Sequence, residues 1–344
     1  MSDYLMNSGT MKAVFLEKPE GRLVVKEVKI PQPGPNEVLI KMSAAPVNPS
    51  DLAKIRSAHT EYDLTSFIPG LEGSGTVVEA GKGILPHLWK GKRVACSSEY
   101  YTSGSWAEYM VTKAGKCFPL GSKVSDEQGS MSLVNPLTAL AFFEIARQNK
   151  HKAIINNAAA GALGRMVELL GKKNSIPVIN IVRNQAQVDT LRQLGSPHVL
   201  NSSDSSFIDD LRSLSHELKA TLLFDSVCSR QLEMMCDALP YGSSVIIYGN
   251  LTGEKQVVFN PRNLISNNLN ISGFYLGTRA RENGLIKNML HLKEVSSLMS
   301  SDLKIKIHVM FPLSEVQEAV DTYLGNMSAG KVLLDCRTTH SNKL

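Results

Sequence analysis

The sequence predicts an α/β protein with two domains, an irregular β domain and a doubly wound parallel sheet. Two features indicate this fold. Short β-branched segments separated by proline and glycine clusters fill the first third of the chain, and after residue 126 short apolar segments alternate with amphipathic ones. A chain of 344 residues is also longer than a single hydrophobic core usually supports. We therefore expect two cores.

The first third of the chain is predicted to be mostly strand. A short helix is expected at residues 49–56, because Asn48 can cap its N-terminus and a proline suits the first helical position. The expected strands of this part are residues 11–16, 23–28, 37–41, 74–79 and 92–95.

Residues 135–275 are predicted to form the parallel sheet. Strands and helices alternate there at a spacing that requires parallel crossovers, with helices on both faces of the sheet. Residues 276–344 break this alternation and are expected to return to the first domain, which spans residues 1–134. The expected strands of the sheet are residues 153–156, 177–182, 198–200, 221–225, 244–248 and 269–273.

The composition indicates a globular protein that acts on a small molecule. A net charge of +5 without any basic run argues against a nucleic-acid-binding protein. No apolar stretch approaches the length of a membrane span. Five widely spaced cysteines without a C-x-x-C motif indicate free thiols, and residues 1–10 resemble no targeting segment. We expect a cytoplasmic protein with neither nucleic-acid nor membrane partners.

A turn of small residues follows the first predicted strand of the parallel sheet, and an amphipathic helix begins directly after it. Such a turn lets a diphosphate approach the backbone N–H groups, and the helix N-terminus adds positive potential. Its pattern, A-x-x-G-x-x-G, departs from G-x-G-x-x-G, so the strand before it and the helix after it carry the prediction of a dinucleotide site. The residues of the turn are Ala158, Ala160, Gly161, Ala162, Leu163 and Gly164.

The end of the next predicted strand bears on the choice of cofactor. Dinucleotide folds that bind NAD usually have a carboxylate there, which accepts a hydrogen bond from the ribose 2′-hydroxyl. Here Arg183 and Asn184 follow the strand, and no carboxylate is present. A guanidinium can bind a 2′-phosphate that a carboxylate would repel. The sequence therefore favours NADPH over NADH.

Several motifs, taken in order, resemble those of the medium-chain dehydrogenase/reductase superfamily. They are residues 70–81, 91–94, 135–139, 158–164, 248–249 and 330–334. The resemblance spans residues 12 to 336 and implies a GroES-like catalytic domain, an inserted Rossmann domain and a C-terminal return to the first domain. It also implies a homodimer, for which residues 269–276 are a candidate sheet edge.

The same resemblance points to a branch of the superfamily without zinc. Leu71 stands where the zinc enzymes have a ligand histidine, and no cysteine precedes residue 96, so we expect no metal. Residues 47–51 are similar to the quinone oxidoreductases and to the mitochondrial-type 2-enoyl thioester reductases. The resemblance places Asn48 and Asp51 near the nicotinamide. It assigns further cofactor contacts to Thr138, Tyr248, Gly249 and Lys331.

Chemistry without a Lewis acid suits an electron-poor alkene or a quinone better than a simple alcohol. After hydride transfer, the α-carbon of an enone still needs a proton. By resemblance to the enoyl reductases, the donor lies in the segment that contains His59 and Tyr62. An imidazole titrates near neutral pH and a phenol is a weak acid, so either can donate, and water is the third candidate.

We therefore expect an NADPH-dependent reductase of quinones or of α,β-unsaturated carbonyl compounds that acts without zinc. Two alternatives stay open at this point. One is a 2-enoyl thioester reductase that acts on acyl-CoA or acyl-carrier-protein substrates, and the other is an NADPH-binding protein without useful turnover.

Overall fold

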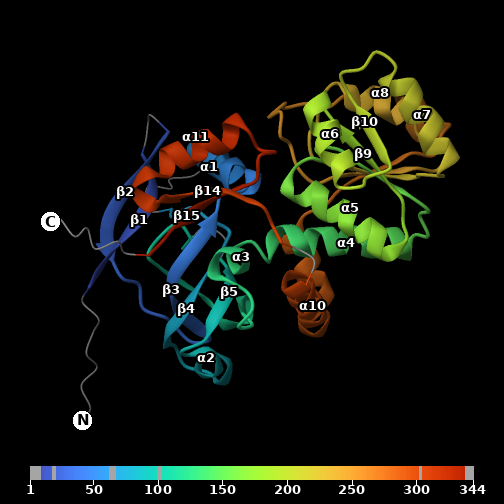
Figure 1. Ribbon diagram of the computed structural model, residues 1–344. Coiled ribbons are helices and arrows are strands. Elements are labelled where there is room, and N and C mark those ends of the chain that lie inside the picture. Colours follow the sequence, from blue (N-terminus) through green and yellow to red (C-terminus); the bar gives the residue numbers. More distant parts are fainter. Residues whose placement is uncertain (1–8, 18–20, 62–66, 99–102, 302–303, 338–344) are drawn as a thin grey trace, which may run out of the picture. The chain divides into compact units, whose positions relative to one another are not determined.

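The computed structural model describes residues 9–17, 21–61, 67–98, 103–301 and 304–337. They belong to two compact units, one of residues 1–134 together with 292–344 and the other of residues 135–291. The second unit ends after residue 291, whereas the sequence analysis placed that boundary after residue 275. The predicted fold class is confirmed, since an irregular β unit accompanies a six-stranded parallel sheet (Figure 1).

The first unit is a mainly antiparallel β structure. Its strands are β1 (Thr10–Glu17), β2 (Arg22–Lys29), β3 (Glu37–Pro46), β4 (Glu72–Ala80), β5 (Arg93–Ser97), β6 (Tyr109–Lys113), β7 (Cys117–Pro119), β14 (Ile307–Pro312) and β15 (Lys331–Asp335). The main sheet has the order β14-β15-β3-β4-β5-β7, and β6 pairs with β3. Because β15 pairs antiparallel with β3, the end of the chain completes the sheet that the first residues began.

Short helices surround this sheet. They are α1 (Pro49–Glu61), α2 (Ile84–Trp89), α3 (Asp126–Ser130) and α11 (Val316–Gly325). The core contains the fully buried side chains of Trp106, Met42 and Met110, and α11 covers it with Val316 and Val320. Helix α1 is the helix that the sequence predicts at residues 49–56, and it extends to Glu61.

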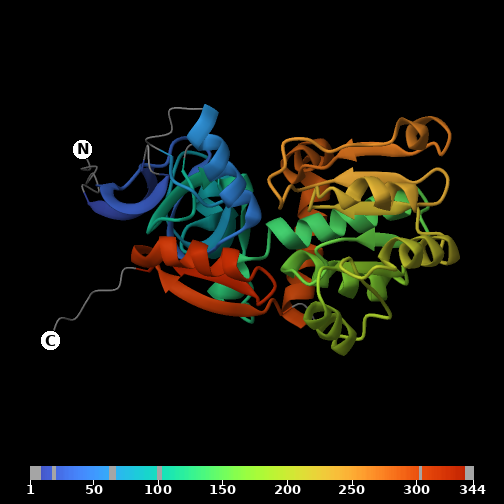
Figure 2. The same cartoon turned by 90° about the horizontal axis from the view of Figure 1, so that it is seen from above.

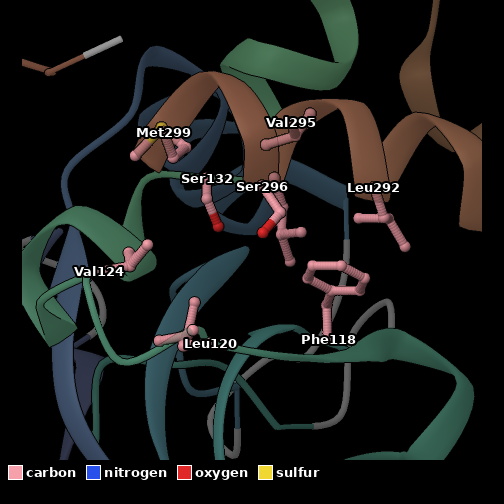
Figure 3. Close-up of a pocket in the computed structure, with 10 residues that line it drawn as sticks. Phe118, Leu120, Val124, Ser132, Leu292, Val295, Ser296 and Met299 are labelled. Carbon is pink, nitrogen blue, oxygen red and sulfur yellow. The ribbon is translucent and has the colours of Figure 1, made fainter. Parts of the chain in front are cut away.

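Helix α10 (Leu276–Ser301) runs from the second unit into the first and is interrupted at Gly284, where φ is 70° and ψ is 176°. Its last part, after residue 291, packs on the first unit through Val295, Leu298 and Met299. Figure 3 shows a small apolar pocket there, between this part of α10 and the segment that contains Leu120 and Ser132. The enclosed space is too small for a reducible substrate.

The second unit is the doubly wound parallel sheet. Its strands are β8 (Ile154–Asn156), β9 (Val178–Val182), β10 (His198–Asn201), β11 (Leu222–Asp225), β12 (Ser244–Ile247) and β13 (Asn270–Gly273), in the order β10-β9-β8-β11-β12-β13. Its helices are α4 (Val134–Gln148), α5 (Ala162–Asn174), α6 (Gln185–Gln193), α7 (Phe207–Glu217), α8 (Gln231–Asp237), α9 (Pro261–Ile265) and the first part of α10. The strand order reverses between β8 and β11, so a ligand is expected at the carboxyl ends of these two strands.

Alternate residues along each strand of this sheet face different helices. On one face, Ile155 and Leu223 pack with Leu211 of α7 and Leu232 of α8. On the other, the ring of Phe224 stacks on Phe142 of α4 with 3.7 Å between the ring centroids. Helices therefore flank the sheet on both sides, as the alternation in the sequence predicts (Figure 2).

No helix in the part of the chain that the structure describes combines the length and the apolar character needed to cross a bilayer.

Candidate functional site

The N-terminus of α1 brings two predicted catalytic residues together. Asn48 precedes the helix, Pro49 occupies its first position and Asp51 lies in its first turn. One carboxylate oxygen of Asp51 accepts a hydrogen bond from the backbone N–H of Asn48 at 2.8 Å, and the other accepts one from the N–H of Leu71 at 2.8 Å. Asp51 thus fixes the start of the helix and also the residue that replaces the zinc-ligand histidine.

Asn48, Asp51, Glu72 and Lys331 form a buried polar group that we call the Asn48 cluster. Their exposed fractions are 1%, 1%, 1% and 2%. The amide nitrogen of Asn48 donates to Glu72 Oε1 at 3.0 Å, and the amide oxygen accepts from Lys331 Nζ. The cluster therefore links the end of β3, the start of β4 and the start of β15.

Glu72 also holds the beginning of α4. Its second oxygen, Oε2, accepts from the backbone N–H of Leu133 at 3.0 Å and from that of Val134 at 2.9 Å. The carboxylate therefore caps the N-terminus of α4. Glu72 is thus a structural carboxylate that joins the start of β4 to the start of α4.

Burial dominates the electrostatics of the Asn48 cluster. It raises the pKa of Asp51 to about 7, to which the nearby charge of Glu72 also contributes. It raises the pKa of Glu72 and lowers that of Lys331, although attraction between these two groups opposes both shifts. One turn further along α1, burial lowers the pKa of Lys54 to about 8, against the attraction of Asp51.

The turn of small residues lies between β8 and α5, as predicted. Ala158 has a positive φ of 51°, and the N–H of Gly161 donates to its carbonyl at 3.0 Å. Gly161 is the N-cap of α5 and offers no side chain to the helix. The N-terminus of α5 therefore receives no capping hydrogen bond from the side chain at its N-cap position, as expected of a turn that binds a diphosphate.

The carboxyl end of β9 lies beside this turn. The N–H of Ala159 donates to the carbonyl of Ile181 at 3.2 Å, and Ala159 and Ala160 pack with Val182. The next residue, Arg183, has an exposed side chain. Arg183 therefore directly follows the strand that packs against this turn.

Asn184 caps the helix that follows β9. It is the N-cap of α6, and its side-chain oxygen accepts from the N–H of Gln187 at 3.0 Å. Lys172, by contrast, lies in the last turn of α5, far from the helix N-terminus, and donates to the carbonyl of Leu194 at 2.8 Å. Lys172 therefore lies at the opposite end of α5 from the turn of small residues.

The predicted contacts on α4 and β12 lie in the second unit. Thr138 is a buried residue of α4. The ring of Tyr248, just after β12, meets Phe142 edge-on with 4.9 Å between centroids, and burial raises its pKa to about 12. Gly249 follows, and its carbonyl accepts from the thiol of Cys228 at 3.1 Å.

Two residues at the point where the strand order reverses were missed by the sequence analysis. The amide nitrogen of Asn157, after β8, donates to the carboxylate of Asp225 at the end of β11, and the amide oxygen accepts from the N–H of Ser226 at 2.9 Å. Asp225 also accepts from the N–H of Cys228 at 2.8 Å, and burial raises its pKa. The signal was present, because Asp225 is the polar end of an otherwise apolar strand and Asn157 directly follows the first strand of the sheet.

Comparisons with known proteins agree with this arrangement. The alcohol dehydrogenase GroES-like domain family matches residues 34–122, and the zinc-binding dehydrogenase family matches residues 162–291. A solved structure described as an NADPH:quinone reductase from Mesorhizobium loti is 31% identical, covers 97% of this chain and 100% of its own, and has a TM-score of 0.88. The chain belongs to the medium-chain dehydrogenase/reductase superfamily. Its two units are the GroES-like and Rossmann domains of that superfamily.

Relatives of this medium-chain reductase include enoyl-[acyl-carrier-protein] reductases and quinone oxidoreductases. The mitochondrial enoyl-[acyl-carrier-protein] reductase of Arabidopsis thaliana is 26% identical over 94% of this chain and 87% of its own length. The quinone oxidoreductase of Sus scrofa is 24% identical over 92% of this chain and 94% of its own length.

The two predicted proton donors are His59 and Tyr62. His59 lies on α1, but its side chain is not among those described, and Tyr62 lies outside the described residues. Among the described residues, no group of three or more His, Cys, Asp or Glu side chains could hold a metal ion. The roles of all predicted site residues stay predictions.

Proposed function

We propose that the protein is an NADPH-dependent reductase that transfers hydride to quinones or to the activated C=C bond of α,β-unsaturated carbonyl compounds, without zinc. The observation that carries this proposal is the position of Leu71. In this superfamily member its backbone N–H is bound to Asp51, and its side chain has no atom that can ligate a metal. The names of the relatives in both groups support the same class of reaction.

The cofactor site supports NADPH in particular. The turn at residues 158–164 fits a diphosphate, and the exposed guanidinium of Arg183 lies at the strand end where a 2′-phosphate is bound in this fold. A carboxylate is missing at that position, so the 2′-hydroxyl of NADH would lack its usual acceptor. When bound, the nicotinamide supplies the hydride.

The chain's own groups would handle the charge that develops on the acceptor. Addition of hydride to the β-carbon of an enone leaves an enolate, and reduction of a quinone leaves a hydroquinone anion. A hydrogen bond from an N–H donor stabilises the oxygen anion of the enolate or of the hydroquinone, most strongly where water is excluded. Our candidate for this donor is the side-chain amide of Asn48. The α-carbon then takes a proton from His59, Tyr62 or water.

A 2-enoyl thioester reductase is the second candidate. The enoyl-[acyl-carrier-protein] reductase of Arabidopsis thaliana covers nearly the whole chain, and its reaction has the same electronic demand, because a thioester carbonyl also activates its C=C bond. An NADPH-binding protein without turnover is the third.

Steady-state oxidation of NADPH with a panel of acceptors separates these functions. We expect turnover with 1,4-quinones or simple enones. Turnover confined to enoyl-CoA or enoyl-carrier-protein substrates would favour the second function. Tight binding of NADPH, measured by fluorescence, without turnover of any acceptor would favour the third and contradict the main proposal.

The edge of the parallel sheet supports a homodimer. β13 is the last strand in the order of that sheet, and its residues are mostly exposed. A second copy that adds its own β13 would continue the sheet across the two subunits. Light scattering of the purified protein tests this. A reducing compartment such as the cytoplasm agrees with the five cysteines, all of which are free and buried.

A further inference from the structure

The amide of Asn48 is held from two sides by groups of opposite character. Lys331 Nζ is only a donor, so it must meet the amide oxygen, and a carboxylate oxygen of Glu72 accepts from the amide nitrogen at 3.0 Å. These two contacts fix which way the amide points. They also leave one N–H of the Asn48 amide outside this pair of contacts.

Both of these neighbours are themselves fixed. The second oxygen of Glu72 accepts two backbone N–H groups at the start of α4. The backbone of Lys331 is tied to Lys306 by a 2.8 Å hydrogen bond, and the following residue, Val332, accepts from the N–H of Val47 at 2.9 Å. Strand β15 therefore places Val332 beside Val47, the residue that precedes Asn48, and Lys331 next to Val332 in the chain.

We propose that Lys331 is a positioning residue, whose ammonium holds the Asn48 amide so that its remaining N–H is presented to the acceptor oxygen. The inference rests on the proposed function, in which that oxygen becomes an anion. It differs from a direct role in cofactor binding, because Lys331 acts here only through Asn48.

The charges of the Asn48 cluster agree with this role. Lys331 is 2% exposed, so burial lowers the pKa of its ammonium, and attraction to Glu72 and Asp51 opposes that shift. Without the ammonium, the oxygen of the Asn48 amide loses its partner, and only the contact with Glu72 still orients the amide. A donor displaced by about 1 Å can lower a rate by about a hundredfold.

A double-mutant cycle tests the inference. Lys331→Met should lower kcat with an enone by about tenfold to a hundredfold and leave the Kd of NADPH unchanged. In an Asn48→Ala background, the same substitution should cause no further loss, because the group through which it acts is already absent. Lys306→Met, at a neighbouring exposed lysine, is the matched control and should match the parent.

Independent losses in the double variant, or a raised Kd for NADPH in Lys331→Met, would overturn the inference in favour of a cofactor contact. If Lys331→Met does not fold, Lys331→Arg replaces it. That variant keeps the charge but changes the reach of the donor, so its kcat should fall only when Asn48 is present.

An NMR measurement, which does not depend on turnover, tests the positioning role of Lys331 separately from the proposed function. The side-chain amide signal of Asn48 in ¹⁵N NMR spectra can be assigned by its loss in Asn48→Ala. It should shift in Lys331→Met and stay in place in Lys306→Met. If the parent protein shows no turnover but the Asn48 signal responds to the variants in this way, the proposed function is refuted and the positioning role of Lys331 is supported. An unmoved signal in Lys331→Met would refute the positioning.

Discussion

A Cβ atom on Gly164 would lie 2.3 Å from the carbonyl oxygen of Ala159 and 2.5 Å from its Cα. These are backbone atoms, which cannot move aside as the end of a flexible side chain can. At Gly161 the nearest atom to an added Cβ is the carbonyl oxygen of Ala158, at 3.3 Å. Gly164 is thus required by the packing of α5 on the turn, and Gly161 is not.

We expect Gly164→Ala to lower the free energy of unfolding by about 1–3 kcal/mol, the usual cost of overpacking. Gly161→Ala should leave stability within about 0.5 kcal/mol of the parent and still weaken NADPH binding, because it adds a methyl group to the turn that we propose binds the diphosphate. Urea unfolding and fluorescence titration with NADPH measure the two effects. Equal unfolding midpoints for the two variants would show that the close approach at Gly164 is not a constraint.

Arg183→Ala should raise the KM for NADPH at least tenfold and leave the KM for NADH nearly unchanged. A charge-assisted phosphate contact contributes about 1.5–3 kcal/mol, and NADH has no 2′-phosphate. The backbone contacts of Arg183, to Gln187 and Ser203, survive the substitution.

Arg192→Ala is the control for this experiment, since Arg192 is an exposed arginine in the last turn of α6. It should behave as the parent with both cofactors. If the parent uses NADH and NADPH equally well, or if Arg183→Ala and Arg192→Ala are alike, the guanidinium of Arg183 has no part in cofactor choice.

The purified protein should contain no stoichiometric zinc and should keep its activity in a chelator. Leu71 has no ligand atom, and the described residues contain no cluster of metal-binding side chains. Elemental analysis together with an NADPH-oxidation assay in EDTA checks this. One zinc per chain, with activity that is lost in EDTA and restored by the metal, would contradict the zinc-free reaction.

The parts of the fold that the sequence predicted are those with a local signal. The strands of the parallel sheet are short apolar segments between amphipathic helices, and that alternation is readable without any tertiary contact. Helix α2 was missed because it has no amphipathic pattern, with Ile84 and Leu88 exposed. Strand β7 was missed because it has three residues and depends on its pairing with β5.

The candidate site also contains residues that a local sequence pattern predicts and one residue that it does not. Asn48 and Asp51 stand three residues apart at a helix start, so capping geometry alone brings them together. Lys331 reaches the same cluster from the far end of the chain, and only the pairing of β15 with β3 places it there. No local pattern distinguishes a lysine that contacts Asn48 from one that contacts a cofactor.

The raised pKa of Asp51 makes the stability of the first unit depend on pH in a definite direction. In the unfolded chain this carboxyl ionises near pH 4, and in the folded protein near pH 7. Between these values the folded state holds a proton that the unfolded state has lost. The unfolded state therefore binds fewer protons, and stability falls as the pH rises from about 4 to about 7, with no further change from this group above that.

Asp51→Asn should remove this contribution. The variant loses a hydrogen-bond acceptor toward the N–H of Asn48 or of Leu71, which lowers its stability by an amount that does not depend on pH. The parent should lose more of its unfolding free energy between pH 5 and pH 8 than the variant does, because only the parent must ionise a buried carboxyl at that position. Urea unfolding at both pH values measures the difference, and Asp189→Asn, at an exposed residue of α6, is the control that should follow the parent. Equal pH dependence in the parent and in Asp51→Asn would mean that Asp51 ionises at its ordinary pKa in the folded protein.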